Sequence, residues 1–399
     1  MSDRLPCVLM RGGTSKGVFF HDRDLPADRG DRIAALLALL GSPDPGQIDG
    51  LGSGTVTTSK VMIIAPSRDP AADVEFTFCQ IGTRGATVEF SGTCGNLSAA
   101  VAPFAIDEGL VPAVEPVTVV RMLNANTRKL VVAEVPIESG KAATTGAYRI
   151  AGVPGTGAEI RLRYFDPAGA ITGTLLPTGQ PQEVVQLGDR AAVHVSIVDA
   201  ANPFIFVRAE DVGLTGTERP ADLRARPEVL ALAEAARGYA AERLGLAEHA
   251  ADAWRTTPDI PKMAFIAPPK RYVALDGQPI EADDYDVAAR MIAIGEAIPA
   301  YALSGAICTA VAAQVAGSVV WDAIPADRRG RARVLLAHPS GVMDGEAVVE
   351  TGPAGGLLVE SVSVGRTARR LIAGAAPLPP NWRERGTGAT VTVSTRGGD

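Results

Sequence analysis

The chain has 399 residues, 46% hydrophobic and 21% charged, a composition typical of globular proteins and long enough for two domains. Its net charge of −7, without a long basic run, argues against non-specific nucleic-acid binding. The four cysteines show neither CxxC spacing nor a paired histidine motif, which argues against a disulfide framework or a zinc site. Since the N-terminus also lacks a signal-peptide pattern, we expect a cytoplasmic protein.

The first motif is a glycine turn, MRGGTSKGVFF, at residues 10–20. It is typical of a β-hairpin, and its backbone N–H groups could also cradle an anion. The pattern GxxxxGK[ST] is absent, so this is not a phosphate-binding loop of that type. Both interpretations of the turn stay open on the local pattern.

Short strands dominate much of the rest of the chain. After an amphipathic helix predicted at 32–40, the stretch SGTVTTSKVMIIA (53–65) predicts a turn followed by a β-branched strand. Alternation of apolar and polar residues predicts further strands at 73–79, 86–90, 116–122, 129–135, 158–164, 192–198 and 389–394. An aromatic content of only 5% and 43 glycines fit this many strands joined by tight turns.

Two helices rich in small residues interrupt the β pattern, one over 94–109 with a kink expected at Pro103, the other over 304–315. Amphipathic surface helices are predicted at 228–244 and 283–294. Residues 297–321 carry no charge and could span a bilayer by length alone. Their Ala, Gly, Ser and Thr content favours a helix buried inside a globular domain instead.

The two small-residue helices align with each other when Ser98 is matched to Thr309. Strand-like segments surround both, which suggests an internal duplication, although alanine-rich helices also resemble one another by composition. We expect a first domain at 1–187 and a second at 188–385. The C-terminal strand, within about 386–396, could pair back into the first domain.

Cys94 begins the first of these helices, in SGTCGNLSAA (91–100). A thiol just before a helix lies near unpaired backbone N–H groups, a position that favours the reactive thiolate. The same N–H groups could bind a carboxylate or an enolate oxygen. A small buried residue in a tight turn is an equally good interpretation. None of the four histidines lies in a cysteine-hydrolase motif, which argues against that enzyme class.

Lysine is rare in this chain, with six lysines against 32 arginines among its 38 basic residues. A lysine that persists against this bias could be needed as an amine, because a desolvated lysine can act as a base and an arginine cannot. Lys60 and Lys262 each stand at the entrance of an apolar strand. Either could point into a polar pocket or to solvent.

The chain carries the motifs RGGTSKG, GSPD with QIDGLG and TSK, CGNLSAAVAPFAI, and HPSG. With these motifs it resembles the PrpF family over about residues 8–375. This family includes isomerases of 2-methylaconitate, 4-oxalomesaconate and methylitaconate. The resemblance implies an α+β, diaminopimelate-epimerase-like fold. Such a fold has two similar domains, each a β-barrel-like sheet wrapped around a central helix, with the active site in the cleft between them.

The resemblance also implies cofactor-independent proton transfer by a catalytic pair, Lys60 and Cys94. It implies a substrate site formed by residues from both domains: Arg11, Gly12, Gly13, Thr14, Ser15, Lys16, Gly95, Asn96, Lys262, Ser304 and Gly305. Related racemases use two opposed thiols, but here the position aligned with Cys94 is Gly305. A two-thiol racemase is therefore disfavoured.

The expected reaction is cis-trans or 1,3-allylic isomerisation of an unsaturated di- or tricarboxylate, with a 2-methylaconitate-like substrate favoured. Alternatives are a 4-oxalomesaconate isomerase, a non-catalytic acid-binding accessory to a dehydratase, and an amino-acid racemase. Thr93 and residues 56–58 depart from the methylaconitate branch and could face a different substituent. Besides the small carboxylate, a homodimer and a partner dehydratase are the expected partners, and no nucleic acid, membrane, metal or cofactor is expected.

Overall fold

The computed structural model describes residues 4–90, 94–187, 192–257, 260–293, 295–352 and 356–392. The chain forms two compact units, one of residues 1–164 with 365–399 and one of residues 165–364. This division differs from the boundary expected at 187/188. Residues 165–187 belong with the second unit because Ala168 bridges to Ala200 and the strand Glu183–Val185 pairs with Val193–Ala200.

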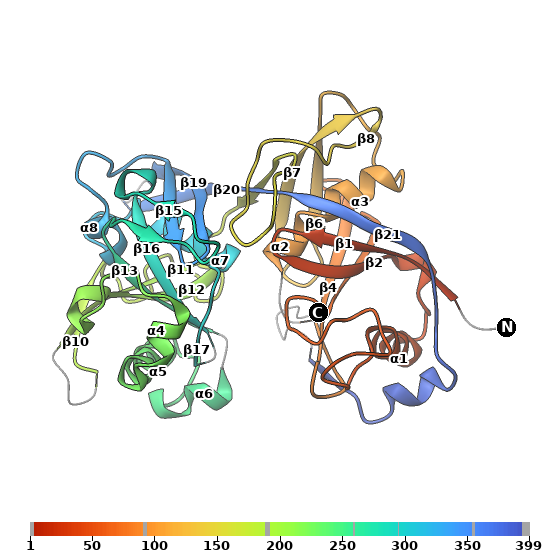
Figure 1. Ribbon diagram of the computed structural model, residues 1–399, viewed down its shortest axis with the longest axis horizontal. Helices are drawn as coiled ribbons and strands as arrows, with labels where there is room; N and C mark the ends of the chain where they lie inside the picture. Colours follow the sequence, from red (N-terminus) through yellow and green to blue (C-terminus); the bar gives the residue numbers. More distant parts are fainter. Residues whose placement is uncertain are drawn as a thin grey trace. The chain divides into compact units, whose positions relative to one another are not determined.

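Unit 1 is built mainly of strands (Figure 1). They are β1 (Arg4–Gly12), β2 (Ser15–His21), β3 (Lys60–Pro66), β4 (Val74–Ile81), β5 (Thr87–Glu89), β6 (Val117–Asn124), β7 (Leu130–Glu138), β8 (Lys141–Ala142), β9 (Ile160–Phe165), β21 (Ala368–Pro377) and β22 (Thr390–Thr392). Its helices are η1 (Asp22–Asp24), α1 (Arg29–Leu40), α2 (Gly95–Ser98), α3 (Val101–Asp107) and η5 (Trp382–Gly386).

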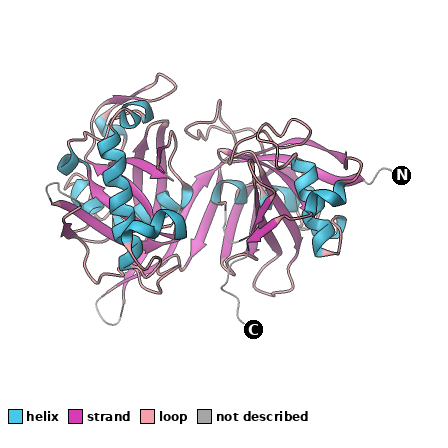
Figure 2. Cartoon of the chain, turned by 90° about the horizontal axis from the view of Figure 1, so that it is seen from below, coloured by secondary structure: helices cyan, strands magenta, loops and turns pink. Residues whose placement is uncertain are grey.

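Unit 2 has the same character, with helices packed against strands (Figure 2). Its strands are β10 (Glu183–Val185), β11 (Val193–Ala200), β12 (Asn202–Arg208), β13 (Lys262–Ala267), β14 (Tyr272–Val273), β15 (Pro279–Ile280), β16 (Val287–Ala293), β17 (Glu296–Ala297), β18 (Arg333–His338), β19 (Gly341–Thr351) and β20 (Leu357–Arg366). Its helices are η2 (Ala209–Val212), α4 (Pro220–Arg224), α5 (Pro227–Arg243), η3 (Ala250–Asp252), α6 (Ala253–Thr256), η4 (Ala282–Asp284), α7 (Leu303–Ala312) and α8 (Val319–Ala323).

The two units repeat one topology. In unit 1, β1–β2 is antiparallel, β2–β3 parallel, β3–β4 antiparallel, β4–β6 parallel, and β6–β7 and β7–β9 antiparallel. In unit 2 the same sequence of pairings runs through β11, β12, β13, β16, β18, β19 and β20. Internal duplication explains this match, because chance similarity of alanine-rich helices would not reproduce six consecutive pairings.

Each sheet curves around a central helix. In unit 1, α2 contacts β1 and β2 while α3 contacts β3, β6 and β7, strands that span most of the sheet order. In unit 2, α7 contacts β11 and β12 at one end of that order and β18 and β19 towards the other. One helix can touch strands so far apart in a sheet only if the sheet wraps around it.

A second helical layer covers the outside of each sheet. In unit 1, Leu36 and Leu37 of α1 belong to the same core cluster as Val18 on β2 and Val61 on β3. In unit 2, α5 packs in the same way against β12 and β13. The alternate residues of β2 and β3 therefore face the central helix, and the Phe19 ring lies 5.7 Å from that of Phe104 on α3.

The prediction of a buried helix within 297–321 is confirmed by α7, whose residues are buried except Ser304. Among the described residues, no helix is both long and apolar enough to cross a membrane. The first small-residue helix is interrupted at Ala99–Ala100, one turn before Pro103 rather than at it. A proline disturbs the carbonyl four residues earlier, which here belongs to Ala99.

The amphipathic helix predicted at 283–294 is wrong. Residues 282–284 form a single 3₁₀ turn, and Val287–Ala293 form strand β16, which pairs with β13 on one side and β18 on the other. A strand between two others is buried on both faces, so its apolar run lacks the alternation that identifies half-buried strands.

The end of the chain returns to unit 1. β21 pairs with β1 along its whole length, and β22 pairs in parallel with β5 at Thr390–Thr392. β22 covers the first part of the strand predicted at 389–394, and residues 393–394 lie outside the described residues. The return begins near residue 365, about twenty residues earlier than the sequence indicated, because β21 has no alternating pattern.

Candidate active site

Three strands place the predicted unit 1 site residues at the same end of the sheet. The β1–β2 hairpin turns between Gly12 and Ser15, which are paired partners. β3 begins at Lys60, which lies opposite Gly17 on β2 and opposite Gln80 near the end of β4. Since paired residues point to the same face, the side chains of Lys60 and Gln80 face the central helix.

The glycines of RGGTSKG allow the start of α2 to lie directly on this hairpin. A Cβ atom on Gly12 would come within 2.7 Å of the Asn96 carbonyl oxygen, and one on Gly13 within 2.3 Å of Asn96 Oδ1. Gly13 also has a φ of +51°, a conformation that favours glycine. The hairpin interpretation of the motif is confirmed, and its glycines are explained by contact with the helix.

Cys94 is the N-cap residue of α2, with an extended backbone and no capping hydrogen bond from its side chain. Its Sγ donates to Ser15 Oγ over 3.8 Å, and its carbonyl accepts from both the backbone N–H and the hydroxyl of Ser98. The thiol is half-buried. Cys94 and Ser15 thus face each other between the helix start and the hairpin, beside Gly95 and Asn96.

The Lys60 side chain is 7% exposed, which is unusual for lysine. Its Nζ donates to Gln80 Oε1 over 2.6 Å and lies 4.9 Å from the centre of the Phe78 ring. Gln80 is held in turn, because its Nε2 donates to the Ser59 and Val56 carbonyls. The amine is therefore fixed in place by an uncharged partner.

Lys16 points from β2 towards the loop 41–59. Its Nζ donates to Ser53 Oγ over 2.8 Å and its backbone N–H donates to Thr57. The loop folds around the buried Gln47, whose Oε1 accepts from Ser59 Oγ and the Gly54 N–H. The GSPD and QIDGLG motifs thus build the loop that carries Ser53 and leads into Lys60.

Arg11 fixes the backbone of the glycine turn. Its guanidinium donates to the Gly13 and Thr367 carbonyls, each over 2.9 Å, and to the Thr367 hydroxyl over 3.0 Å. The pKa of Arg11 is lowered from its ordinary value. Burial is the larger cause, and repulsion from the neighbouring Arg369 is the smaller one. Arg11 therefore fixes the turn, and the substrate contact that the sequence predicts for it stays a prediction. Thr14, at the tip of the turn, is half-buried.

Arg366 is a site residue that the sequence did not identify. It is 3% exposed, and its Nε donates to Asn96 Oδ1 over 3.1 Å. Arg366 ends β20, some 270 residues from Asn96, and no motif surrounds it. Gln80 was missed for the same reason, since only the β3–β4 register shows that it lies opposite Lys60.

Cationic side chains with neutral hydrogen-bond partners gather at this end of unit 1. Among the described residues, the hydrogen-bond partners of Lys16 and Lys60 are the neutral side chains Ser53 and Gln80. Arg11 bonds only neutral oxygens there. A site with several cations paired to neutral groups attracts carboxylates. No group of three or more His, Cys, Asp or Glu side chains in the described part of the chain is arranged to hold a metal ion.

In unit 2, Lys262 begins β13 and lies opposite Phe204 on β12, the position that corresponds to Lys60 and Gly17 in unit 1. Ser304 and Gly305 lie in the first turn of α7. A Cβ on Gly305 would come within 2.9 Å of the Phe204 ring, so this glycine also permits close helix–sheet packing. These residues belong to the duplicated counterpart of the unit 1 site.

Cys308 has a different environment from Cys94. It is fully buried in α7, its Sγ donates to the Val198 carbonyl, and burial raises the pKa of its thiol well above the ordinary value. A thiol in this state is a core residue. This agrees with the sequence-based argument against a two-thiol racemase.

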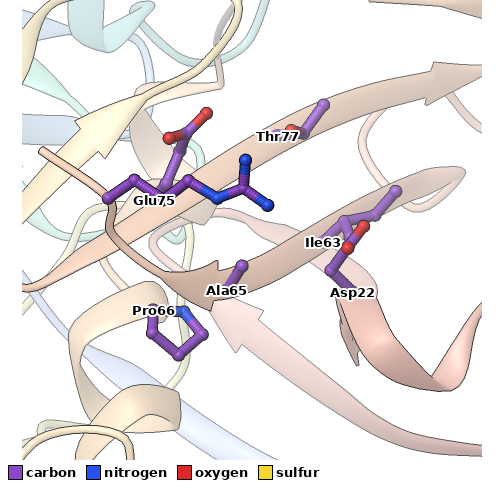
Figure 3. Close-up of a pocket in the computed structure, with 7 residues that line it drawn as sticks. Asp22, Ile63, Ala65, Pro66, Glu75 and Thr77 are labelled. Atoms are coloured by element: carbon purple, nitrogen blue, oxygen red, sulfur yellow. The ribbon is translucent and has the colours of Figure 1, made fainter.

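A surface pocket of about 270 Å³ lies on β3 and β4, lined by Asp22, Ile63, Ala65, Pro66, Arg68, Glu75 and Thr77 (Figure 3). Along β3, Ile63 and Ala65 are an odd number of residues from Lys60. Along β4, Thr77 and Glu75 are an odd number of residues from Gln80. By the alternation of strands they point to the opposite face of the sheet. This pocket is therefore separate from the Lys60 and Cys94 side chains. Thr93, expected beside the thiol, lies outside the described residues.

Comparison with known proteins defines the class to which this duplicated fold belongs. A solved structure of methylitaconate-delta-isomerase superposes with a TM-score of 0.86 at 41% identity, covering 95% of this chain and 97% of that one. A hydroxyproline epimerase from Agrobacterium vitis shares the fold alone, with a TM-score of 0.50 at 14% identity over 96% of both chains. The fold is thus the epimerase-like α+β fold that the sequence predicted.

The family model described as "PrpF protein" matches residues 2–379, and this chain belongs to the PrpF family. The 3-methylitaconate isomerase of Eubacterium barkeri is 43% identical over 377 residues, covering 94% of this chain and 97% of that protein. The 2-methyl-aconitate isomerase of Shewanella oneidensis is 36% identical over 391 residues, again covering 94% and 97%. The expected family membership is confirmed.

Proposed function

We propose that this protein is an isomerase of an unsaturated di- or tricarboxylate and works by removing and returning a proton without a cofactor. One observation carries the proposal: the buried Lys60 amine is held at 2.6 Å by the uncharged Gln80, on the same face of the sheet as the Cys94 thiol. We keep the 2-methylaconitate-like substrate favoured by the sequence; the Shewanella oneidensis relative is named for 2-methyl-aconitate, and the more similar Eubacterium barkeri relative for 3-methylitaconate.

The proposed reaction begins when Lys60 removes a proton from the carbon γ to a carboxylate, across the double bond. The electron pair spreads over the conjugated system as a dienolate, and the former double bond gains single-bond character. If that bond rotates before the proton returns to the same carbon, the product is the cis-trans isomer. If the proton returns at the other end, the double bond shifts by one position. No net proton or electron is consumed in either case.

The other site residues have supporting roles in this proposal. Cys94 and the N–H groups at the start of α2 face the substrate, and the thiol donates a proton or polarises a carboxylate. Lys16 binds a carboxylate as a cation, and Lys262, Ser304 and Gly305 bind the substrate from unit 2. Arg11 and the glycines 12 and 13 hold the hairpin on which Ser15 approaches the thiol.

Incubation with a small panel of acids tests the proposal. Purified protein is mixed with 2-methylaconitate isomers, trans-aconitate, oxalomesaconate and methylitaconate, and with proline as a racemase control, and products are followed by proton NMR. Conversion of one unsaturated acid, with proline unchanged, is the expected result. Turnover of proline alone would overturn the proposal in favour of a racemase, against which the buried Cys308 argues.

The oligomeric state, the protein partner and the cellular location are also proposals. We keep the homodimer expected from the sequence, and note that β21 exposes Leu371 and Ile372 at 44% and 64%. Light scattering of the purified chain tests it, with twice the 41.3 kDa chain mass expected. A partner dehydratase and a cytoplasmic location fit a metabolic isomerase. Co-purification with a tagged chain and cell fractionation test them.

A further inference from the structure

Tyr164 has a buried hydroxyl that finds no hydrogen-bond partner within the described part of the chain. It stands on β9, where Ile160 and Leu162 on the same face are 1% and 0% exposed. Alternation therefore turns the Tyr164 side chain inward, towards the side where the central helix lies. The residue as a whole is half-buried, but its Oη is fully covered, and among the described residues no atom hydrogen-bonds to it.

A buried hydroxyl without a partner weakens the folded state, so its retention needs an explanation. Phenylalanine would fill the same volume without that cost. Groups of this kind are commonly satisfied by a bound water or ligand. The environment of Tyr164 decides which kind of ligand fits.

Two groups of the proposed site are the electrostatic neighbours of this hydroxyl. Burial is the main cause that raises the pKa of Tyr164 well above its ordinary value; the Arg366 guanidinium opposes this and the Cys94 thiol adds to it. The phenol therefore stays protonated and acts as a hydrogen-bond donor at any ordinary pH. A donor beside a guanidinium and a thiol suits an anionic oxygen.

We propose that Tyr164 is a further substrate-contacting residue, whose hydroxyl donates a hydrogen bond to a carboxylate or dienolate oxygen of an unsaturated acid bound beside Cys94. This inference rests on the proposed function for the identity of the acid. The anion-binding role itself does not require turnover. In this proposal Tyr164 acts together with Cys94 and with Arg366, whose Nε donates to Asn96 Oδ1 at the start of α2.

Tyr164→Phe removes only the hydroxyl, and Tyr272→Phe is the matched control. Tyr272 is also buried, but its hydroxyl donates to the His338 and Gly341 carbonyls in the core of unit 2. Tyr272→Phe should lower the Tm and leave kcat/KM unchanged. Tyr164→Phe should keep or raise the Tm and lower kcat/KM by about 10–100-fold, the loss of one hydrogen bond to a charged group.

Calorimetric binding of trans-aconitate to the full chain separates this proposal from the proposed function. We expect Tyr164→Phe to raise the Kd for trans-aconitate by about 10–100-fold, whether or not the wild type turns the acid over. Equal Kd and kcat/KM in the wild type and Tyr164→Phe would overturn the role of Tyr164 while leaving an isomerase intact. A raised Kd in Tyr164→Phe, with no turnover of any acid of the panel by the wild type, would instead support Tyr164 and overturn the isomerase. A wild type that binds no acid would overturn both.

Discussion

The Nζ atom of Lys60 and the Oε1 atom of Gln80 lie 2.6 Å apart, on residues directly opposite each other in β3 and β4. Gln80 is an amide, so it fixes the nitrogen without placing a formal negative charge beside it, whereas a carboxylate at this position would add one. The β3–β4 register thus gives the proposed base, Lys60, an uncharged hydrogen-bond acceptor. Several measurable consequences depend on this choice of residue.

Gln80→Glu should lower the rate at pH 7 by about 10–100-fold and move the pH–rate profile to higher pH, because the new carboxylate stabilises the ammonium form of Lys60. Gln80→Met is the control, since it loses the same bonds to the Ser59 and Val56 carbonyls without adding charge. Initial rates from pH 6 to 10 decide the point. Identical profile midpoints for the two variants would contradict the prediction.

Lys16→Met should raise KM by about tenfold and leave kcat nearly unchanged, because it removes a cation that binds substrate and transition state alike. Lys141→Met is a matched control in unit 1, since Lys141 also donates to a neutral oxygen, the Asp107 carbonyl, at 2.7 Å. Steady-state kinetics of both variants provide the test. An unchanged KM in Lys16→Met would place the carboxylate elsewhere.

Gly13→Ala should destabilise the protein and raise KM, because the new Cβ meets Asn96 Oδ1 at 2.3 Å and the φ of +51° disfavours alanine. Gly140→Ala has a comparable φ of +74° but open space around it, so it measures conformational strain alone, about 1–2 kcal/mol. Urea unfolding compares the two. The clash predicts a larger loss for Gly13→Ala, and equal losses with normal KM would refute it.

Glu108→Gln should lower the free energy of unfolding at pH 7 by about 1–3 kcal/mol and leave activity unchanged. Glu108 is the C-cap residue of α3, at the end of that helix far from Cys94. Its carboxylate pairs with Arg370 at 2.6 Å and with His21 at 3.2 Å. Burial alone raises the pKa of Glu108, but the bonds to Arg370 and His21 outweigh it and lower the pKa below its ordinary 4.5.

The sign of the pH effect follows from that lowered pKa. The carboxylate contributes stability above about pH 4.5, and the contribution is lost as the pH falls through the lowered value of the folded state. Urea titrations at pH 7 and pH 3 should therefore show the wild type and Glu108→Gln converging in acid. A gap of equal size at both pH values would show that the ionised carboxylate is not its cause.

Local patterns were sufficient for several elements of the chain. The strands around Lys60, the β6–β7 hairpin and the buried α7 appear near their predicted positions because alternation and turn residues there are clear. β16 was mistaken for a helix since both its faces are buried. Pattern methods fail for a strand of this kind because burial on both sides erases the two-residue period.

The candidate site was only partly accessible from sequence. Cys94, Lys60 and the glycine turn lie in motifs, so the family resemblance reached them. Gln80, Arg366 and Tyr164 lie on strands with ordinary composition. Only strand register and tertiary packing place Gln80 beside Lys60 and Arg366 beside Asn96, and Tyr164 enters the site only through our proposal. Arg11 was in the right motif, but its three bonds to the turn could not be foreseen from sequence spacing.

Removal of a proton by Lys60 from a carbon γ to a carboxylate is the step on which the proposed function depends. Proton NMR in D₂O with the acid panel measures this step directly. We expect deuterium at the γ carbon of one acid with the wild type, and exchange slowed by about 10²–10⁴-fold in Lys60→Ala. Exchange at the wild-type rate in Lys60→Ala would show that Lys60 is not the base.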